Sequence, residues 1–430
     1  MSVSRPLHIL YLVQQFPPEV GAGAGRVLEM ARRWVEAGAR VTVVTGMPNR
    51  PQGVVHPDYR GRLFVDEEWE GIRVLRSWLY ASPEHGFART VANNASFMVT
   101  SAVHALVRAT KPDVLIASSP PFLPHVAGAA VATLRRIPLV LEVRDLWPDY
   151  MVSMGVVRER SVAARALFTL ERGLLRRATH AVAVTESFRR RLVQKGMDAG
   201  DVTVIPNGID IATYRPASEP APIPALQRRG DEFLVGYLGN FGVSQALEAV
   251  VDAARILRDV PGIRFVLVGD GTDRRRLERH VAAAGAGNLS VHPPIPKDAT
   301  RAFYNACDVT LVPLASFPVL QETVPSKIFE VMGCARPVLA SLRGEAATIT
   351  RESGGGVVVE PEDAQGIADA VLRLRAMPAA ERAAMGEMGR AYAIAHYSRE
   401  VLADRYLDLL LRLTGRSAEA TASAGTGEDG

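Results

Sequence analysis

The chain has 430 residues, more than the roughly 250–300 that one hydrophobic core usually serves, so the sequence predicts two domains. Apolar residues make up 48% and charged residues 22%, a globular balance that excludes disorder for the bulk of the chain. The formal net charge of +4 is mild for this length and no nucleic-acid-binding module is recognisable, so nothing in the sequence indicates a nucleic-acid partner.

The apolar run at the N-terminus is too short for a signal peptide. The sequence contains no run of about 18 or more apolar residues, so no membrane-spanning helix is predicted. The two cysteines, Cys307 and Cys334, lie far apart in apolar surroundings. We interpret them as buried side chains in a reducing compartment, not as a disulfide or a metal site. The sequence therefore predicts a cytoplasmic protein.

Short apolar runs alternate with amphipathic stretches through the first half of the chain. The runs lack polar alternation, which is typical of parallel strands covered by helices on both faces. The predicted strands are residues 8–13, 41–45, 114–117, 139–143, 181–184 and 202–205, and the clearest helices are residues 26–37, 92–108 and 163–177. We therefore assign residues 1–213 to an N-terminal doubly wound α/β domain.

A proline-rich segment, residues 214–230, interrupts this alternation and is the predicted linker, because proline favours extended backbone. Residues 231–398 form a predicted second doubly wound domain, and a helix at 399–414 is expected to return to the first domain. The strands of the second domain are predicted at residues 233–238, 265–268, 289–292, 309–312, 338–340 and 356–359. The tail, residues 417–430, has no apolar face and is predicted to be disordered.

Glycines alternate at Gly21, Gly23 and Gly25, between the first predicted strand and the first predicted helix. Such a loop can bring backbone N–H groups close to a phosphate at a helix N-terminus, or it can be a plain tight turn. A dinucleotide-binding fingerprint is disfavoured, because Arg26 occupies the place of its third glycine. Phosphate or sugar binding and a structural turn both remain open.

The apolar run 139–143 leads directly into Arg144 and Asp145. Charged side chains at the end of a buried strand must pair with each other or face a cleft, since unpaired burial is costly. A structural ion pair between Arg144 and Asp145 is one interpretation. A sugar site is the other, because Trp147 beside Asp149 offers a flat apolar surface next to a polar group.

Two glycine-bearing loops, YLGNFG and LVGDGTD, follow strands in the second half. In an open parallel sheet, ligands bind beyond the carboxyl ends of the strands. Gly239 and Gly242 would let a phosphate approach, and Gly269 and Gly271 would let a nucleobase or ribose lie against the backbone. Together the loops place a nucleotide on this half of the chain.

The segment QETVPSKIFE contains two carboxylates around the start of a short predicted helix, Glu322 before it and Glu330 inside it. Ser326 and Lys327 at the helix N-terminus can bind an anion such as pyrophosphate, and the carboxylates can accept hydrogen bonds from sugar hydroxyls. The alternative is a solvated helix pair between Lys327 and Glu330. Neither a D-x-D pattern nor histidine ligand spacing indicates a metal, so cations and backbone dipoles are expected to stabilise a leaving group.

Taken in order, these motifs resemble those of the family-4 retaining glycosyltransferases of the GT-B fold over residues 7–412. The resemblance is carried by FPPEVGAGAGR, RDLWPD, VIPNGID, YLGN, LVGDG, the Glu322 and Glu330 pair, and ARPVLAS. RDLWPD and VPSKIFE are most similar to a branch that transfers N-acetylated amino sugars in bacterial surface-polysaccharide assembly. The resemblance implies two Rossmann-like domains facing a cleft and a nucleotide-sugar donor, with a UDP-sugar favoured, and it implies no cofactor and no metal.

The resemblance also implies roles for individual residues. Glu330 would bind the donor ribose, and Glu322 would contact the transferred sugar. The backbone at Ile295 and Pro296 would hold the nucleobase, and Gly23 to Arg26 would reach the donor phosphate or the acceptor.

The chain departs from the family pattern in its positive charges. Arg144 stands where many relatives have a histidine near the reacting centre. Many relatives also follow the YLGN loop with an arginine and then a lysine that neutralise pyrophosphate, whereas this chain has Asn240 and Gln245. Our hypothesis is that Lys327 takes this role, with Arg144 contributing from across the cleft.

The acceptor is a glycan, a lipid-linked sugar or a small molecule. Basic and apolar residues interleave in residues 87–111 and 158–177. Such faces can contact the inner face of an anionic membrane, or they can be ordinary solvated helix faces. Two other functions remain open from the sequence: a nucleotide-sugar epimerase of similar fold, and a non-catalytic sugar-nucleotide-binding subunit.

Overall fold

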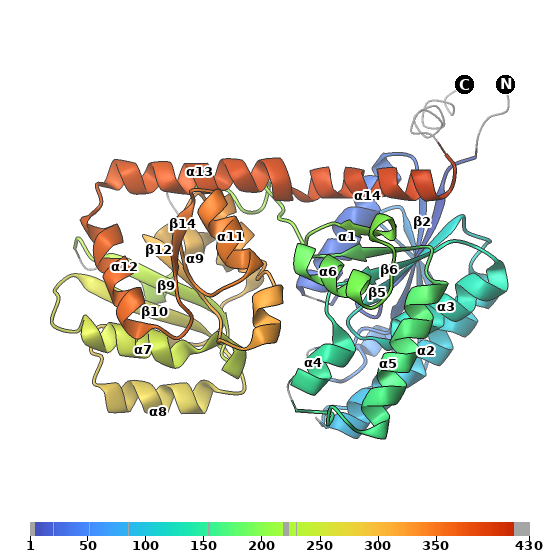
Figure 1. The fold of residues 1–430 in the computed structure, drawn as a ribbon, viewed down its shortest axis with the longest axis horizontal. Helices are drawn as coiled ribbons and strands as arrows, with labels where there is room; N and C mark the ends of the chain where they lie inside the picture. Colours follow the sequence, from blue (N-terminus) through green and yellow to red (C-terminus); the bar gives the residue numbers. More distant parts are fainter. Residues whose placement is uncertain are drawn as a thin grey trace. The chain divides into compact units, whose positions relative to one another are not determined.

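The computed structural model describes residues 5–19, 21–50, 52–84, 86–153, 155–217, 223–228 and 230–416. The chain divides into two compact units (Figure 1). Unit 1 runs to Asn207 and resumes at Arg399, and unit 2 is Gly208–Ser398. The predicted tail at 417–430, and residues 218–222 and 229 of the predicted linker, lie outside the described residues.

Unit 1 is built on an eight-stranded sheet with the order β3-β4-β2-β1-β5-β6-β7-β8. Its strands are β1 (His8–Leu12), β2 (Arg40–Gly46), β3 (Phe64–Trp69), β4 (Ile72–Ser77), β5 (Val114–Ser119), β6 (Leu139–Val143), β7 (His180–Ala183) and β8 (Val202–Val204). All pairings are parallel except the antiparallel β3 and β4. This hairpin was not predicted from the sequence, because β3 is polar and alternates between exposed and half-buried positions.

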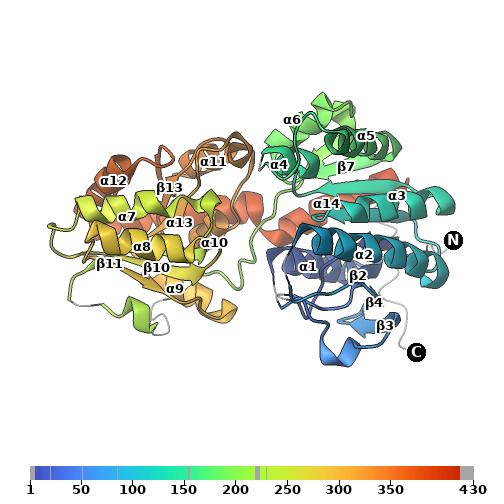
Figure 2. The same cartoon turned by 90° about the horizontal axis from the view of Figure 1, so that it is seen from below.

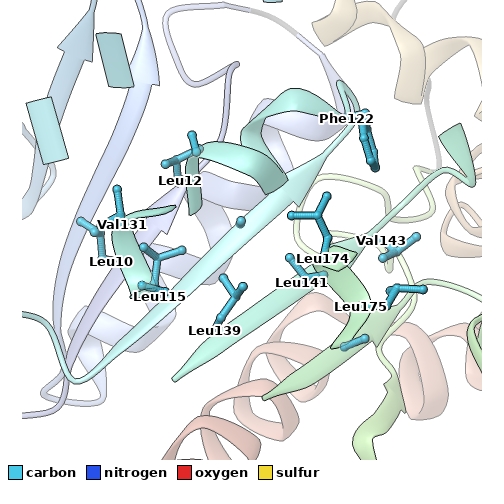
Figure 3. Close-up of a cluster of buried hydrophobic side chains, with 14 of the residues drawn as sticks. Leu10, Leu12, Leu115, Phe122, Val131, Leu139, Leu141, Val143, Leu174 and Leu175 are labelled. Carbon is cyan, nitrogen blue, oxygen red and sulfur yellow. The ribbon is translucent and has the colours of Figure 1, made fainter. Parts of the chain in front are cut away.

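Helices cover both faces of the sheet in unit 1. On one face, α2 (Phe87–Arg108), α3 (Leu123–Arg135), α5 (Val162–Arg177) and α6 (Glu186–Gln194) enclose a buried apolar cluster with the strands, part of which is drawn in Figure 3. On the other face, α1 (Ala22–Glu36) and α14 (Arg399–Leu413) enclose a second cluster. The short helix α4 (Trp147–Ser153) follows β6. The predicted three-layer arrangement is therefore confirmed for this half.

The C-terminal helix α14 packs on α1 through aromatic and apolar contacts within unit 1. The indole Nε1 of Trp34 donates a hydrogen bond to the carbonyl oxygen of Ala403 at 2.9 Å. The same indole meets the ring of Tyr406 edge-on, with 5.3 Å between the centroids. These contacts explain why a helix so late in the sequence belongs to the N-terminal unit.

Unit 2 holds a six-stranded, fully parallel sheet with the order β11-β10-β9-β12-β13-β14. Its strands are β9 (Phe233–Asn240), β10 (Ile263–Asp270), β11 (Leu289–His292), β12 (Val309–Pro313), β13 (Val338–Ser341) and β14 (Gly356–Val359). One face carries α7 (Leu247–Ile256), α8 (Arg274–Ala284) and α12 (Ala364–Ala376). The other carries α9 (Thr300–Ala306), α10 (Lys327–Gly333), α11 (Glu345–Glu352) and α13 (Ala379–Tyr397), as Figure 2 shows from below.

Both sheets reverse their winding direction at one point, between β1 and β5 in unit 1 and between β9 and β12 in unit 2. Ligand sites of doubly wound sheets form at this switch point, beyond the carboxyl ends of the strands. Two Rossmann-like units are thus present, and the loops that follow their central strands are the places to search for a site.

The described part of the proline-rich segment packs onto unit 2. Tyr214, Ile223 and Leu226 are buried in the apolar cluster beneath α9, α10 and α13. The chain passes from unit 1 to unit 2 at Asn207, before the predicted boundary at residue 213, because Ile209 is already buried in the same cluster. Proline-rich sequence here serves as a packed segment of unit 2.

Candidate functional site

The centre of unit 1 is a carboxylate at the end of β6 that no solvent reaches. Glu142 is fully buried, and its Oε2 accepts hydrogen bonds from the hydroxyl of Tyr11 at 2.7 Å and from Ser118 Oγ at 2.6 Å. Its Oε1 accepts from Arg26 Nη2 at 3.2 Å. Burial alone would raise the pKa of Glu142, but Arg26, Arg144 and the hydroxyl donors outweigh it and lower the pKa. Glu142 is therefore an ionised, fully hydrogen-bonded anchor.

The glycine-rich segment is helical, which corrects the expectation of an open loop from Gly23 to Arg26. Helix α1 begins at Ala22, and the N–H of Gly25 donates to the carbonyl of Gly21 at 3.0 Å. The Arg26 guanidinium is only 1% exposed and donates to Glu142 and to the carbonyls of residues 205 and 206. These bonds occupy the charge of Arg26, so it is a structural link and is not turned towards a phosphate.

Arg144 and Gly23 lie against each other. A Cβ added to Gly23 would come within 2.7 Å of Arg144 Nη1, so any side chain there would displace the guanidinium. Arg144 Nε donates to the carbonyl of Ser119 at 3.0 Å and lies 4.0 Å from Glu142. The structure thus brings two of the predicted site residues together at the carboxyl edge of the sheet.

Asp145 follows Arg144 in the sequence, but among the described residues no ion pair joins the two. Arg144 instead forms an ion pair with Glu142. Asp145 is half-buried, and burial raises its pKa to about 6, a rise that the charge of Arg144 only partly offsets. The interpretation of Arg144 and Asp145 as a mutual structural pair is therefore wrong. A carboxyl group poised to titrate near neutral pH at a strand end is typical of a functional site.

The predicted sugar platform of Trp147 and Asp149 is engaged in packing. Trp147 packs against the apolar cluster under α5, and Asp149 forms an ion pair with Lys195. Lys195 also pairs with Glu171 at 2.7 Å. Asp149 thus belongs to a structural ion-pair network that joins α4, α5 and the residue after α6.

In unit 2, the two glycine loops pack backbone against backbone. Gly239 and Gly269 are register partners at the ends of β9 and β10. A Cβ on Gly269 would lie 1.8 Å from the carbonyl oxygen of Gly239, and one on Gly271 would lie 2.2 Å from that of Phe241. Gly269 and Gly271 are therefore needed for the close approach of the loops. Their predicted contact with a nucleobase or ribose stays a prediction.

Gly239 makes room for a cation. Its missing side chain would lie 2.6 Å from Nζ of Lys327, which enters from the start of α10. The Lys327 ammonium donates to the carbonyl of Leu238 at 3.2 Å and lies 4.3 Å from the ring centroid of Tyr237. Burial lowers the pKa of Lys327 to about 8, against the opposing charge of Glu330. The amine thus points under the β9 loop, and the alternative of a solvated Lys327–Glu330 pair is wrong.

Glu330 is held by a tyrosine that the sequence analysis missed. The buried hydroxyl of Tyr304, on α9, donates to Glu330 Oε2 at 2.9 Å. Burial, with Glu330 nearby, raises the pKa of Tyr304 well above its usual value, so the phenol remains a donor. Tyr304 and Glu330 are distant in sequence, and no local pattern links them. Glu142 had a signal, because it is the one polar residue within the apolar run 139–143.

The remaining predicted donor residues lie around the same end of the unit 2 sheet. Glu322 ends a 3-10 turn (Pro318–Glu322), and Ser326 is half-buried at the start of α10 without capping it through its side chain. Asn240 is exposed, and its Nδ2 donates to Gln245 Oε1 at 3.3 Å. Ile295 is half-buried against the core after β11, and Pro296 is exposed beside it.

Two further features bear on chemistry. Cys307 and Cys334 are free and buried, and burial raises the pKa of each thiol to about 12, so both are inert thiols. Within the described part of the chain, no group of three or more His, Cys, Asp or Glu side chains is placed to hold a metal ion. No described helix is both long and apolar enough to cross a membrane.

Two family models match the chain. A glycosyl transferase 4-like domain matches residues 21–208, and the domain of glycosyl transferases group 1 matches residues 232–376. The chain is 27% identical over 383 residues to WcaI of Escherichia coli (strain K12), a putative colanic acid biosynthesis glycosyl transferase. This match covers 86% of the chain and 93% of WcaI. The chain is also 30% identical over 209 residues to the D-inositol 3-phosphate glycosyltransferase of Acidothermus cellulolyticus. This second match covers 46% of each of the two chains.

Solved structures share the fold. Sucrose-phosphate synthase from Thermosynechococcus elongatus superposes with a TM-score of 0.74 and 20% identity, covering 96% of this chain and 100% of that one. HepE from Anabaena, solved with UDP-glucose, superposes with a TM-score of 0.68 and 17% identity, covering 94% and 100%. At such identities the likeness establishes the architecture alone.

The raised pKa of Asp145 predicts a pH-dependent change in stability. The folded state holds the Asp145 proton up to about pH 6, whereas an unfolded aspartate loses it near pH 4, so ionisation between these values destabilises the fold. We expect Asp145→Asn to raise the free energy of unfolding by about 1–2 kcal/mol at pH 7.5 and to leave it unchanged at pH 4. Thermal unfolding at both pH values measures this, with the exposed Asp408→Asn as the control. An equal effect at both pH values would contradict it.

Proposed function

This chain belongs to the family-4 glycosyltransferases of the GT-B fold, and on that premise we propose that it transfers a sugar with retention from a UDP-sugar. Use of a nucleotide-sugar donor is common to this family. The transferred group would be a hexosyl or N-acetylaminosugar residue. The acceptor would be a glycan, a lipid-linked sugar or a small molecule in polysaccharide or glycoconjugate synthesis. The match to a putative colanic acid biosynthesis enzyme supports the polysaccharide setting.

The observation that carries the donor assignment is the half-buried Lys327, whose amine lies beneath the β9 loop. An ammonium has three donors, and the described contacts give Lys327 one hydrogen-bond acceptor, the carbonyl of Leu238. A diphosphate at the end of β9 would supply the others and would restore the charge balance that burial disturbs. Helix α10 spans only seven residues, so its dipole adds little, and the lysine supplies most of the charge.

The other contacts with the nucleotide-sugar donor would come from residues at the same end of the unit 2 sheet. In this proposal Glu330, oriented by Tyr304, accepts hydrogen bonds from the donor ribose. Glu322 contacts the transferred sugar, with Ser326 beside the diphosphate. The backbone at Ile295 and Pro296 flanks the nucleobase.

Unit 1 supplies the acceptor side of the reaction. Arg144 is fixed by Ser119 and Glu142, so its guanidinium can hold an anionic group without reorganisation. Asp145, whose pKa of about 6 lies close to neutrality, can take a proton from an acceptor hydroxyl. We propose that the leaving diphosphate is stabilised by Lys327 and backbone N–H groups, with no cofactor and no metal requirement. Unchanged turnover in EDTA would support the last point, and loss restored by a divalent cation would refute it.

A panel of nucleotide sugars tests the donor class. A ligand that binds only the folded state stabilises it by about 2.7 kcal/mol at a concentration one hundred times its Kd. We expect UDP-sugars to raise the unfolding midpoint in a concentration-dependent way, and GDP- and dTDP-sugars to do so less. If no nucleotide sugar shifted the midpoint, the proposed donor site would be wrong.

Replacing Lys327 separates the diphosphate from the nucleoside. Lys327→Met keeps the length of the side chain and removes its charge, so UDP should bind about 10–100-fold more weakly. Uridine, which lacks phosphate, should bind the variant and the unmodified protein equally. Calorimetric titration of both ligands measures this, with the exposed Lys111→Met as the control. Equal losses for uridine and UDP would mean that Lys327 supports the fold of the site without contacting phosphate.

A further inference from the structure

Three helices on one face of unit 1 carry almost no negative charge. Helices α2, α3 and α5 lie side by side over the sheet, and α3 contacts both of the others (Figures 1 and 2). Neither α2 nor α3 contains an aspartate or glutamate. The only carboxylate of α5, Glu171, is buried and paired with Lys195. No acidic side chain of these three helices therefore faces solvent.

The exposed side of α5 carries unpaired arginines. Arg165, Arg172 and Arg176 are exposed, and none forms an ion pair with any described residue. With about 100° between successive helical residues, the three fall on one side of the solvent-facing arc. On α8, by comparison, Arg274 pairs with Glu278 and Arg276 pairs with Glu248. The charge of α5 is left without such partners.

Large apolar side chains lie beside these arginines. Val162 on α5 is 82% exposed, and Leu134 on α3 and Val107 on α2 are 69% and 73% exposed. Between α3 and α5 lies an open, mostly apolar hollow of about 710 Å³. It is lined by Ala129, Val162, Arg165, Ala166, Leu170 and Arg177, together with three further residues of α5, Thr169, Gly173 and Leu174. We call the residues that line this hollow, together with Arg172 and Arg176, the α5 surface.

We propose that the α5 surface docks unit 1 onto a bilayer containing anionic phospholipids. The unpaired arginines would meet lipid phosphates, and the exposed valine and leucine side chains would enter the boundary between headgroups and acyl chains. Charge decides between occupants, because a surface without exposed carboxylates complements a uniformly anionic plane. This inference does not depend on the proposed sugar transfer, since it rests on residues outside the donor and acceptor sites.

Vesicle sedimentation of the full chain tests the proposal. We expect binding to vesicles of phosphatidylcholine mixed with phosphatidylglycerol, little binding to phosphatidylcholine alone, and weaker binding at high salt. Changing Arg165, Arg172 and Arg176 together to Gln should lower the partition coefficient roughly a hundredfold. The matched control changes three exposed arginines of unit 2, Arg275, Arg279 and Arg373, to Gln and should bind like the unmodified chain.

A second pair of variants tests the apolar contribution. Leu170→Ser should weaken vesicle binding several-fold, whereas Leu372→Ser on α12 should not, although both leucines are 38% exposed. UDP affinity should be the same in all of these variants, which shows that they remain folded. The proposal is overturned if the unmodified chain ignores anionic vesicles or if the α5 triple variant binds like its control. It is also overturned if the α5 surface instead holds a second copy, seen as a dimer that the triple variant abolishes without any vesicle binding.

Discussion

The placement of a lysine ammonium beneath the end of a parallel strand is the interaction on which the proposed donor site depends. Lys327 can reach Leu238 only because Gly239 has no side chain, and Gly239 in turn is fixed by its backbone contact with Gly269. The cost of burying the amine appears as a pKa lowered to about 8. A partly desolvated cation with spare hydrogen-bond donors is stabilised by an arriving anion more than a fully solvated one would be, because the fold has already removed part of its water.

Unit 1 shows the opposite arrangement. There the buried charge is a carboxylate, Glu142, and its hydrogen bonds are complete within the unit. Removing a partner from such a network leaves an uncompensated charge, so the network holds Arg26 and Arg144 in place. Arg144 is thereby presented at the strand end without freedom to move. In unit 2, Lys327 keeps hydrogen-bond donors that a ligand could use. In unit 1, the hydrogen bonds of Glu142 are all made within the protein.

Much of the architecture could be predicted because parallel strands appear in the sequence as continuous apolar runs. The short helix around Lys327 could be predicted because Pro325 and Gly333 mark its two ends. The hairpin of β3 and β4 escaped because its polar alternation resembles a loop. The contacts that define the site could not be read from local pattern. Tyr304 meets Glu330 through the packing of α9 on α10, and the amine of Lys327 turns away from its helix neighbour Glu330 towards another strand. The sequence predicts a loop at Gly23 and Gly25, since glycine disfavours helices, yet the packing of Arg26 against Glu142 holds the start of a helix there.

The central claim, that Lys327 contacts the donor diphosphate, is tested most directly by the pKa of its side chain. Isotope-labelled lysine side chains can be titrated by NMR, with the Lys327 signal assigned by its absence in Lys327→Met. We predict a pKa near 8 in the free protein that rises well above this value when UDP is bound and stays near 8 with uridine. A Lys327 pKa that UDP leaves unchanged would contradict the claim.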